Sequence, residues 1–216
     1  MTIDRPNLTA PPERRQPRQP KAQATVQRIL DTTARLLDEV GLSLTTNLIA
    51  RAAGINVATL YQYFPNKEAV FLAVLRRHLE WRTAELPRML DGLHKNPRWR
   101  DQLGAMIDVL VARRDSEPGV RSLRLAMRAS PELAAESHAA AVQVAEYLAA
   151  ELQQGAGIDE ARARVSALCA MEALIALLDV REFHLVSDKA AVEQQIHAML
   201  CAFLAPYLDR AAMAAG

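Results

Sequence analysis

Apolar residues recur three or four positions apart along most of this chain, and that spacing predicts amphipathic helices rather than strands. Glycine, proline and helix-capping residues separate the apolar segments. Together these signals predict nine helices, over about 22–40, 46–53, 57–64, 67–85, 97–115, 120–128, 132–154, 160–185 and 188–211. Proline at position 87 should end or kink the fourth helix. We therefore expect an all-α protein.

The second and third of these helices are short and joined by a tight turn, over the segment 44–67. Thr45 or Thr46 can cap the first helix, because a hydroxyl accepts a hydrogen bond from an unpaired backbone N–H of the first turn. Gly54 follows as the residue that most easily takes the left-handed conformation closing a helix. Asn56 can then cap the next helix. This pattern predicts a helix-turn-helix.

The third helix divides into two faces. Val57, Leu60 and Phe64 share one face and can be buried. The rest of its surface carries small and polar side chains, namely Ala58, Thr59, Tyr61, Gln62 and Tyr63. A helix that only packed in a core would not expose these side chains together. A helix that enters the major groove would, because small residues allow close approach and polar ones reach bases and phosphates.

At these residues the sequence resembles the DNA-binding domain of the TetR family of bacterial transcriptional regulators. The matching features between 29 and 67 are Ile29-Leu30, Leu36-Leu37, Gly41, Thr45-Thr46, Ile49-Ala50, Ala53-Gly54-Ile55, Thr59 to Phe64, and Asn66-Lys67-Glu68. Asn56 stands where the family usually has serine, and Ala58 where glycine is frequent. Both substitutes are compatible with the fold and leave the DNA sequence preference open.

The resemblance and the face analysis together give the expected DNA-binding residues. We expect Thr46, Asn56, Ala58, Thr59 and Gln62 near bases; Tyr61, Tyr63 and Lys67 at phosphates; and Thr45 and Asn47 at the same surface. For Lys67 the alternative is an ordinary solvated lysine. No cofactor and no metal is expected.

Charge divides along the chain. Residues 1–82 hold 12 Lys/Arg and 7 Asp/Glu, a net charge of +5, whereas residues 83–216 carry −4. A basic front half suits contact with phosphate.

We expect a disordered basic, proline-rich arm over 1–21, a helix-turn-helix domain over 22–68 with a linking helix to about 85, and a helical effector-binding and dimerisation domain over 86–216. The arm either contacts DNA or is a solvated tail.

The last two predicted helices carry the signal for a partner. Apolar and small residues occupy nearly every face of 165–178, and such a helix must be covered on more than one side. The resemblance implies a four-helix homodimer interface, whereas the alternative is a monomeric core. The residues expected at this interface are Ala167, Ala170, Leu174, Leu177, Ile196, Met199 and Phe203.

The sequence shows no nucleotide-binding or hydrolase motif, and its histidines lack metal-ligand spacing. An enzyme is therefore not expected. Cys169 and Cys201 lie in apolar helical patterns and are expected to be buried and unreactive, which favours the cytoplasm. No apolar run is long enough for a membrane span.

The resemblance implies a small-molecule effector cavity in the C-terminal domain, with Trp99, Met106, Leu110, Met127, His138 and Met171 as candidate ligand contacts or as plain core.

These observations predict a homodimeric transcriptional regulator that binds a palindromic operator on double-stranded DNA and is released by an effector. Repression is favoured over activation. The alternatives are a helical small-molecule-binding protein or enzyme with no DNA role, and a regulator that responds to a protein partner instead of an effector.

Overall fold

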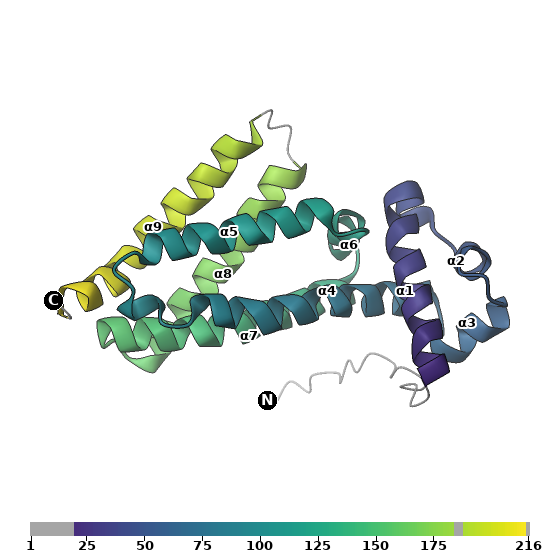
Figure 1. Ribbon diagram of the computed structural model, residues 1–216, viewed down its shortest axis with the longest axis horizontal. Helices are drawn as coiled ribbons and strands as arrows, with labels where there is room; N and C mark the ends of the chain where they lie inside the picture. The colour runs from purple at the N-terminus through teal and green to yellow at the C-terminus, as the bar shows by residue number, and fades with distance from the viewer. Residues whose placement is uncertain (1–19, 184–187, 215–216) are drawn as a thin grey trace, which may run out of the picture. The chain divides into compact units, whose positions relative to one another are not determined.

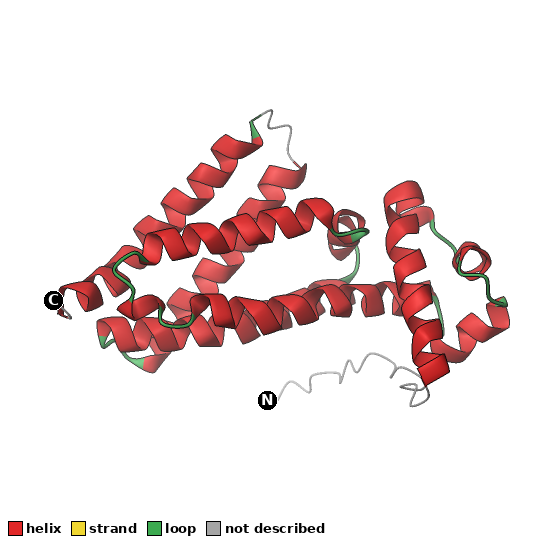
Figure 2. Ribbon diagram, in the orientation of Figure 1, coloured by secondary structure: helices red, strands yellow, loops and turns green. Residues whose placement is uncertain are grey.

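The computed structural model describes residues 20–183 and 188–214, and within them the chain is all-helical with no strand (Figure 1, Figure 2). The nine α-helices are α1 (Pro20–Val40), α2 (Thr46–Ala52), α3 (Val57–Tyr63), α4 (Lys67–Leu90), α5 (Trp99–Ser116), α6 (Val120–Met127), α7 (Pro131–Ala156), α8 (Glu160–Phe183) and α9 (Lys189–Ala214). Two short 3₁₀ helices, η1 (Gly41–Ser43) and η2 (Leu93–Lys95), follow α1 and α4. The predicted all-α class is confirmed.

Several helix ends differ from the sequence prediction by a few residues, and two of these differences involve proline. Helix α1 starts at Pro20 rather than at 22, because proline is tolerated in the first helical turn, where its missing N–H has no partner to lose. Helix α4 does not end at Pro87 but continues to Leu90. Leu86 and Leu90 are at most 2% exposed, so burial of this last turn offsets the backbone hydrogen bond that Pro87 removes. The expected arm over 1–21 lies outside the described residues except for its last two positions, which belong to α1.

The chain forms two compact units. The head unit contains described residues 20–77 and Pro118–Ala134, and the body unit contains 78–117 and 135–214. The first division between the units, at 77/78, falls within the expected linking helix between 68 and 86, whereas the whole of α6, which lies in the expected C-terminal domain, groups with the helix-turn-helix.

Close packing of α6 on α1 explains why the head unit is discontinuous in sequence. Gly119, just before α6, has φ +78°, and a Cβ there would lie 2.8 Å from the carbonyl oxygen of Ala34. Its N–H donates to a carboxylate oxygen of Asp38 at 2.9 Å, and the hydroxyl of Ser122 donates to the carbonyl of Leu37 at 2.8 Å. Only glycine combines this backbone conformation with so close an approach.

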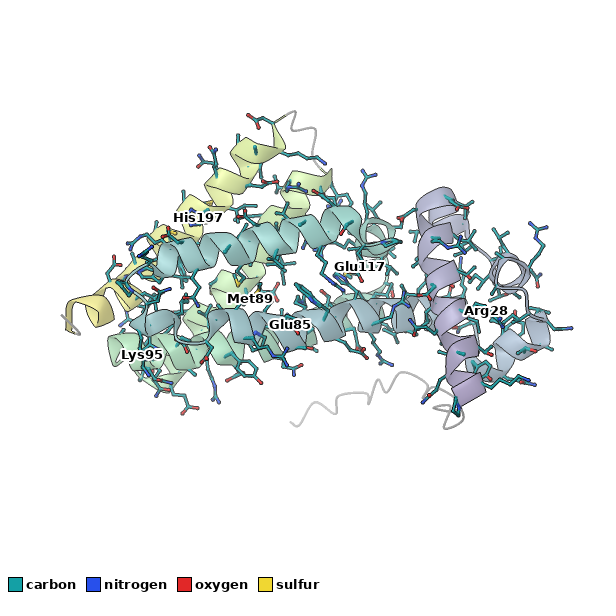
Figure 3. All side chains as sticks on the ribbon, viewed as in Figure 1. Arg28, Glu85, Met89, Lys95, Glu117 and His197 are labelled. Atoms are coloured by element: carbon teal, nitrogen blue, oxygen red, sulfur yellow. The ribbon has the colours of Figure 1, made fainter. Side chains whose placement is uncertain are left out.

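The body unit is built around one hydrophobic core to which α4, α5, α7, α8 and α9 contribute. Helix α9 packs against both α8 and α5 (Figure 1). His197 of α9, labelled in Figure 3, marks the second contact. Its Nε2 lies 2.9 Å from the carbonyl oxygen of Arg100 on α5. Gly104 faces the same imidazole, so a small residue on α5 lets α9 approach. No described helix is both long enough and apolar enough to cross a bilayer.

Candidate nucleic-acid interface

The turn between α2 and α3 has the geometry that the sequence predicted. Thr45 is the cap of α2, and its hydroxyl accepts a hydrogen bond from the N–H of Leu48 at 3.3 Å. Gly54 has φ +64°, and the N–H groups of Gly54 and Ile55 donate back to the carbonyls of Arg51 and Ala50. This pair of bonds is the Schellman motif, which satisfies the last carbonyls of the helix while turning the chain.

Helix α3 is held at both ends and in its middle. Asn56 caps it, with its side-chain oxygen accepting from the N–H of Ala58 at 2.8 Å. Leu60 is fully buried, and Phe64 is 3% exposed at the residue after the helix. Val57 is only half-buried, so the apolar face of α3 is anchored mainly by Leu60 and Phe64. This anchoring fixes which face of α3 points outward.

The outward face of α3 carries the expected groove-contacting side chains. Ala58, Tyr61 and Gln62 are exposed, whereas Thr59 and Tyr63 are half-buried. From the neighbouring turn of α2, the exposed side chains are those of Thr45 and Asn47, and that of Thr46 is half-buried. All ten predicted DNA-binding residues belong to the head unit. They lie in α2 and α3, at the N-caps of these two helices, or at the first residue of α4.

Thr46 and Tyr61 are brought together by the fold. Their hydroxyl oxygens lie 3.0 Å apart, and either can donate. The expected roles of Thr46 at bases and of Tyr61 at phosphate were separate contacts, and both stay predictions. The bond adds a coupling between the first residue of α2 and the exposed surface of α3.

Lys67 begins α4, and its ammonium group is directed at the protein rather than fully into solvent. It donates to the carbonyl oxygen of Leu42 in η1 at 3.3 Å and lies 6.0 Å from the centre of the Phe71 ring. An ammonium group has three donors. The contact with Leu42 therefore leaves donors for a phosphate while holding the side chain on the head unit.

The six candidate effector contacts do not converge on one cavity. Trp99, Met106, Leu110 and Met171 belong to the hydrophobic core of the body unit and are at most 8% exposed. Met127 is half-buried in the head unit. His138 is exposed, and its Nδ1 lies 2.7 Å from a carboxylate oxygen of Glu172. In this conformation the four buried residues are therefore part of the plain hydrophobic core, which the sequence left open as the alternative to a ligand contact.

Several expected dimer contacts are used inside the chain itself. Ala167, Ala170, Leu174 and Ile196 are at most 4% exposed in the core, and Leu177 packs partly buried against it. The four buried side chains are unavailable to a partner in this conformation, since the helical pattern could not separate the inner face of α8 and α9 from the outer one. Leu177 is only half-buried and stays a predicted interface residue. Met199 and Phe203 remain, 53% and 41% exposed, and Val165 on α8 is 64% exposed.

The two cysteines differ from one another. Cys201 is buried, and burial raises the pKa of its thiol because a thiolate loses hydration there. Cys169 is exposed, so the expectation that both are buried was wrong for this residue. Cys169 lies on the same outer surface of α8 as Val165, one turn further along.

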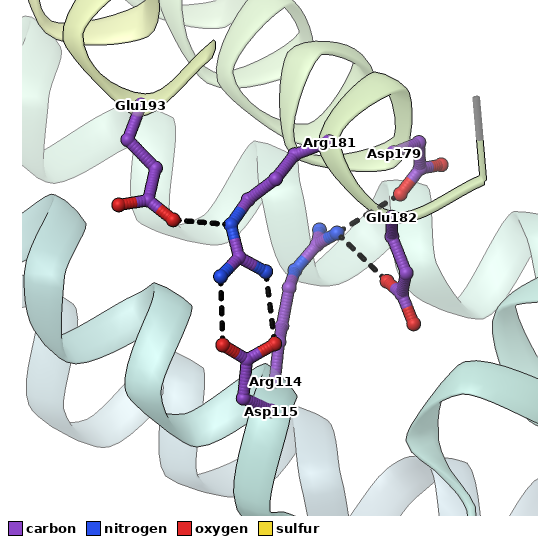
Figure 4. Close-up of polar contacts among 6 residues, drawn as sticks. All are labelled: Arg114, Asp115, Asp179, Arg181, Glu182 and Glu193. Carbon is purple, nitrogen blue, oxygen red and sulfur yellow. Dashed lines mark hydrogen bonds and ion pairs between the residues drawn. The ribbon is translucent and has the colours of Figure 1, made fainter. Parts of the chain in front are cut away.

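An ionic network that the sequence analysis missed joins α5, α8 and α9 (Figure 4). The guanidinium of Arg181 donates two hydrogen bonds to Asp115, at 2.8 and 2.7 Å, and a third to Glu193. Beside it, Arg114 donates to Asp179 at 3.0 Å. The bond from Arg181 lowers the pKa of Asp115 below its usual value, and the same contact raises that of Arg181. The signal in the sequence that could have revealed this network is the clustering of charged residues near the ends of apolar helices.

A short helix-turn-helix with a polar outer face, followed by a larger helical unit, defines the class of helix-turn-helix DNA-binding proteins. Residues 29–74 match the family model described as bacterial regulatory proteins, tetR family, and residues 99–204 match the tetracyclin repressor-like C-terminal domain. The chain belongs to the TetR family of bacterial transcriptional regulators.

Individual relatives agree with this assignment. The chain is 33% identical over 90 residues to the HTH-type transcriptional regulator HbdR of Aromatoleum sp. (strain CIB), a match that spans 41% of this chain and 39% of that relative. A TetR-family transcriptional regulator from Streptomyces coelicolor is 27% identical, with a TM-score of 0.61 over 85% of this chain and 99% of that one. A TetR-family regulator from Mesorhizobium loti MAFF303099 shares the fold at 20% identity, with a TM-score of 0.68 over 87% and 98% of the two chains.

Proposed function

We propose that this TetR-family protein binds a palindromic operator as a homodimer and represses transcription until a small-molecule effector weakens that binding. One observation carries the proposal most directly. Helix α3 is anchored by Leu60 and presents Ala58 and Gln62 outward, so a small side chain and a hydrogen-bonding amide face the same way. An amide can read a base edge in the major groove, and a small neighbour permits the approach.

The base and phosphate roles follow from position on this surface. Gln62 is the main candidate for base reading, with Asn56, Thr59 and Thr46 close to it along the two helices. Tyr61, Tyr63 and Lys67 are candidates for phosphate contacts, which orient a helix without reading sequence. Thr45 serves α2 as its cap, and its role on DNA is through the placement of that helix.

The outer surface of α8 and α9 supports the homodimer. Val165, Met199 and Phe203 are large apolar side chains left exposed in the single chain. Their exposure on the last two helices fits a two-fold interface in which the same patch meets itself. A dimer presents two α3 helices to successive major grooves about 34 Å apart.

The effector part of the proposal places a small molecule in the body unit. Trp99, Met106, Leu110 and Met171 lie together in the hydrophobic core. A ligand there must therefore favour a conformation in which the core helices separate, and it would act by shifting the population of conformers. No catalytic role is part of this proposal.

Selection from random-sequence DNA tests the proposal. The purified full chain is incubated with the DNA pool at moderate salt, and bound fragments are recovered and sequenced. A palindromic motif with half-sites about one helical turn apart is expected. The Gln62→Ala variant, selected in parallel, should recover a motif altered at a symmetric pair of positions.

The proposal is overturned if the folded protein enriches no sequence at any salt concentration tested. A second arm addresses the effector, because a ligand that binds the folded state raises its melting temperature. Compounds that raise it are added to the protein–operator complex, and release of DNA is expected for at least one of them. If no stabilising compound releases the DNA, the effector part of the proposal is wrong and the protein is a DNA-binding regulator without a small-molecule effector.

A further inference from the structure

A cleft of about 370 Å³ is lined only by residues of the head unit. It lies among η1, the first turns of α4, the end of α6 and the start of α7. Its lining residues are Leu42, Asn66, Lys67, Glu68, Ala69, Phe71, Leu72, Ala126, Ala129, Ser130, Glu132 and Leu133. The volume lies in the range of small-molecule sites.

Most polar side chains of the cleft already have partners in the protein. The side-chain oxygen of Asn66 accepts from the N–H of Ala69 at 2.8 Å and caps α4. The hydroxyl of Ser130 accepts from the N–H of Leu133 at 3.4 Å at the start of α7. The ammonium of Lys67 donates to the carbonyl oxygen of Leu42.

The two remaining charged side chains are carboxylates. Glu68 and Glu132 are the second residues of α4 and α7, and both are exposed. Among the described residues neither has a hydrogen-bonding or ion-pair partner for its carboxylate. Carboxylates are negatively charged at neutral pH. With one lysine against two carboxylates, the lining carries a net charge of −1.

Apolar side chains form the walls between these charges. Phe71 is 5% exposed and Leu133 5% exposed, and Leu72 is half-buried beside them. The ammonium of Lys67 lies 6.0 Å from the centre of the Phe71 ring, so this ring contributes apolar wall rather than a free face for a second cation. Apolar walls with an acidic rim match a ligand that has an apolar body and a positive charge.

We propose that this cleft binds a small organic cation with an apolar body, of the class of aromatic or alkyl ammonium compounds. Its charged group lies toward Glu68 and Glu132, and its apolar part lies against Phe71, Leu72 and Leu133. Lys67 keeps its hydrogen bond to the carbonyl of Leu42 and is the one positively charged side chain of the lining. The site needs neither DNA nor a second copy of the chain, so it stands or falls independently of the proposed operator binding.

Isothermal titration of the full chain tests the site with three probes of similar size. They are benzyltrimethylammonium as the cation, phenylacetate as the anion and benzyl alcohol as the neutral comparator. The cation should bind saturably at one site per chain and at least about tenfold more tightly than either comparator, because the two carboxylates that attract it outnumber the one ammonium, of Lys67, that repels it.

Variants locate the site. The double variant Glu68→Gln and Glu132→Gln should weaken cation binding about tenfold, whereas Glu39→Gln, which removes an exposed carboxylate of α1 outside the lining, should leave it unchanged. Loss of helicity in the double variant is checked by circular dichroism. The wild-type comparison of the three probes remains decisive if that variant does not fold.

Three results would overturn the proposal. Equal or tighter binding of phenylacetate or benzyl alcohol would remove the charge argument. Cation binding that the double variant leaves unchanged would place the ligand elsewhere. Absence of saturable binding by the wild-type chain would show that the cleft is not a site for this class of ligand.

Discussion

The hydroxyl oxygen of Tyr61 on α3 lies 3.0 Å from that of Thr46, the first residue of α2. The bond spans 15 residues of sequence and joins the two helices that face DNA in the proposed complex. It ties an exposed aromatic side chain to the start of the neighbouring helix. The pair therefore acts as a unit in positioning α3 relative to α2.

A double-mutant cycle should reveal this coupling. Tyr61→Phe and Thr46→Val each remove the bond, so the second substitution should weaken operator binding much less than it does alone. We expect a coupling energy of about 1 kcal/mol, the net value of an ordinary hydrogen bond. Fluorescence anisotropy with the selected operator measures it. Strict additivity of the two losses would contradict a joint role.

Base reading by Gln62 predicts a change of preference rather than a simple loss. Gln62→Ala should reduce discrimination at one symmetric pair of operator positions by about 1–3 kcal/mol, because its amide can make a bidentate contact with a base. Competition among single-position operator variants measures the effect. Gln143→Ala removes an exposed glutamine of α7 and serves as control. A uniform loss across all operator variants would rule out base reading by Gln62.

Phosphate contact by Lys67 predicts a change in salt dependence. Lys67→Ala should weaken binding to all sequences and lower the slope of log affinity against log salt by about one, since one fewer counterion is released. Lys95→Ala in η2 changes the same charge in the body unit and should leave the slope unchanged. An unchanged slope for Lys67→Ala would indicate that its contact with Leu42 is its whole role.

Dimerisation through the outer surface of α8 and α9 predicts that a charge there separates the subunits. Met199→Glu should raise the dimer dissociation constant at least about tenfold, because burying an unpaired carboxylate in an apolar interface is unfavourable. Sedimentation velocity over a concentration series measures it. Tyr147→Glu alters a side chain on α7 that is 51% exposed and should remain dimeric. Equal behaviour of the two variants would place the interface elsewhere.

The ionic network of Arg181 predicts a dependence of stability on pH. The pKa of Asp115 is lowered in the folded state by its bond to Arg181, so its contribution is present above the carboxyl's unfolded pKa of about 4 and is lost as the pH falls through and below that value. Asp115→Asn should cost about 1 kcal/mol at pH 7, a modest value because Asp115 is half exposed.

Urea unfolding at pH 7 and at pH 3 checks this sign. The difference in unfolding free energy between wild type and Asp115→Asn should be smaller at the lower pH, because there the Asp115 carboxyl is protonated in most unfolded chains and must lose its proton to form the ion pair. Asp108→Asn, which changes an exposed carboxyl in the middle of α5, is the matched control. A difference that is constant or larger at low pH would contradict the role of the ion pair.

Local patterns in the sequence determined the helices and the helix-turn-helix. Gly54, Asn56 and Thr45 act through bonds to residues at most five positions away, so their effects could be inferred from neighbouring residues alone. The same holds for the outward face of α3, because helical periodicity fixes which residues share a side. The structure agrees with these predictions, except that Val57 on α3 is only half-buried and that several helix ends differ by a few residues.

Tertiary structure decided which of two apolar faces is buried, and which distant residues meet. Ala167 and Met199 both lie in apolar helical patterns, yet one is fully buried and the other 53% exposed, because that choice depends on where neighbouring helices pack. Periodicity defines a face and not what covers it. The grouping of α6 with α1 through Gly119, and the meeting of Arg181 with Asp115, likewise depend on contacts between residues far apart in the chain.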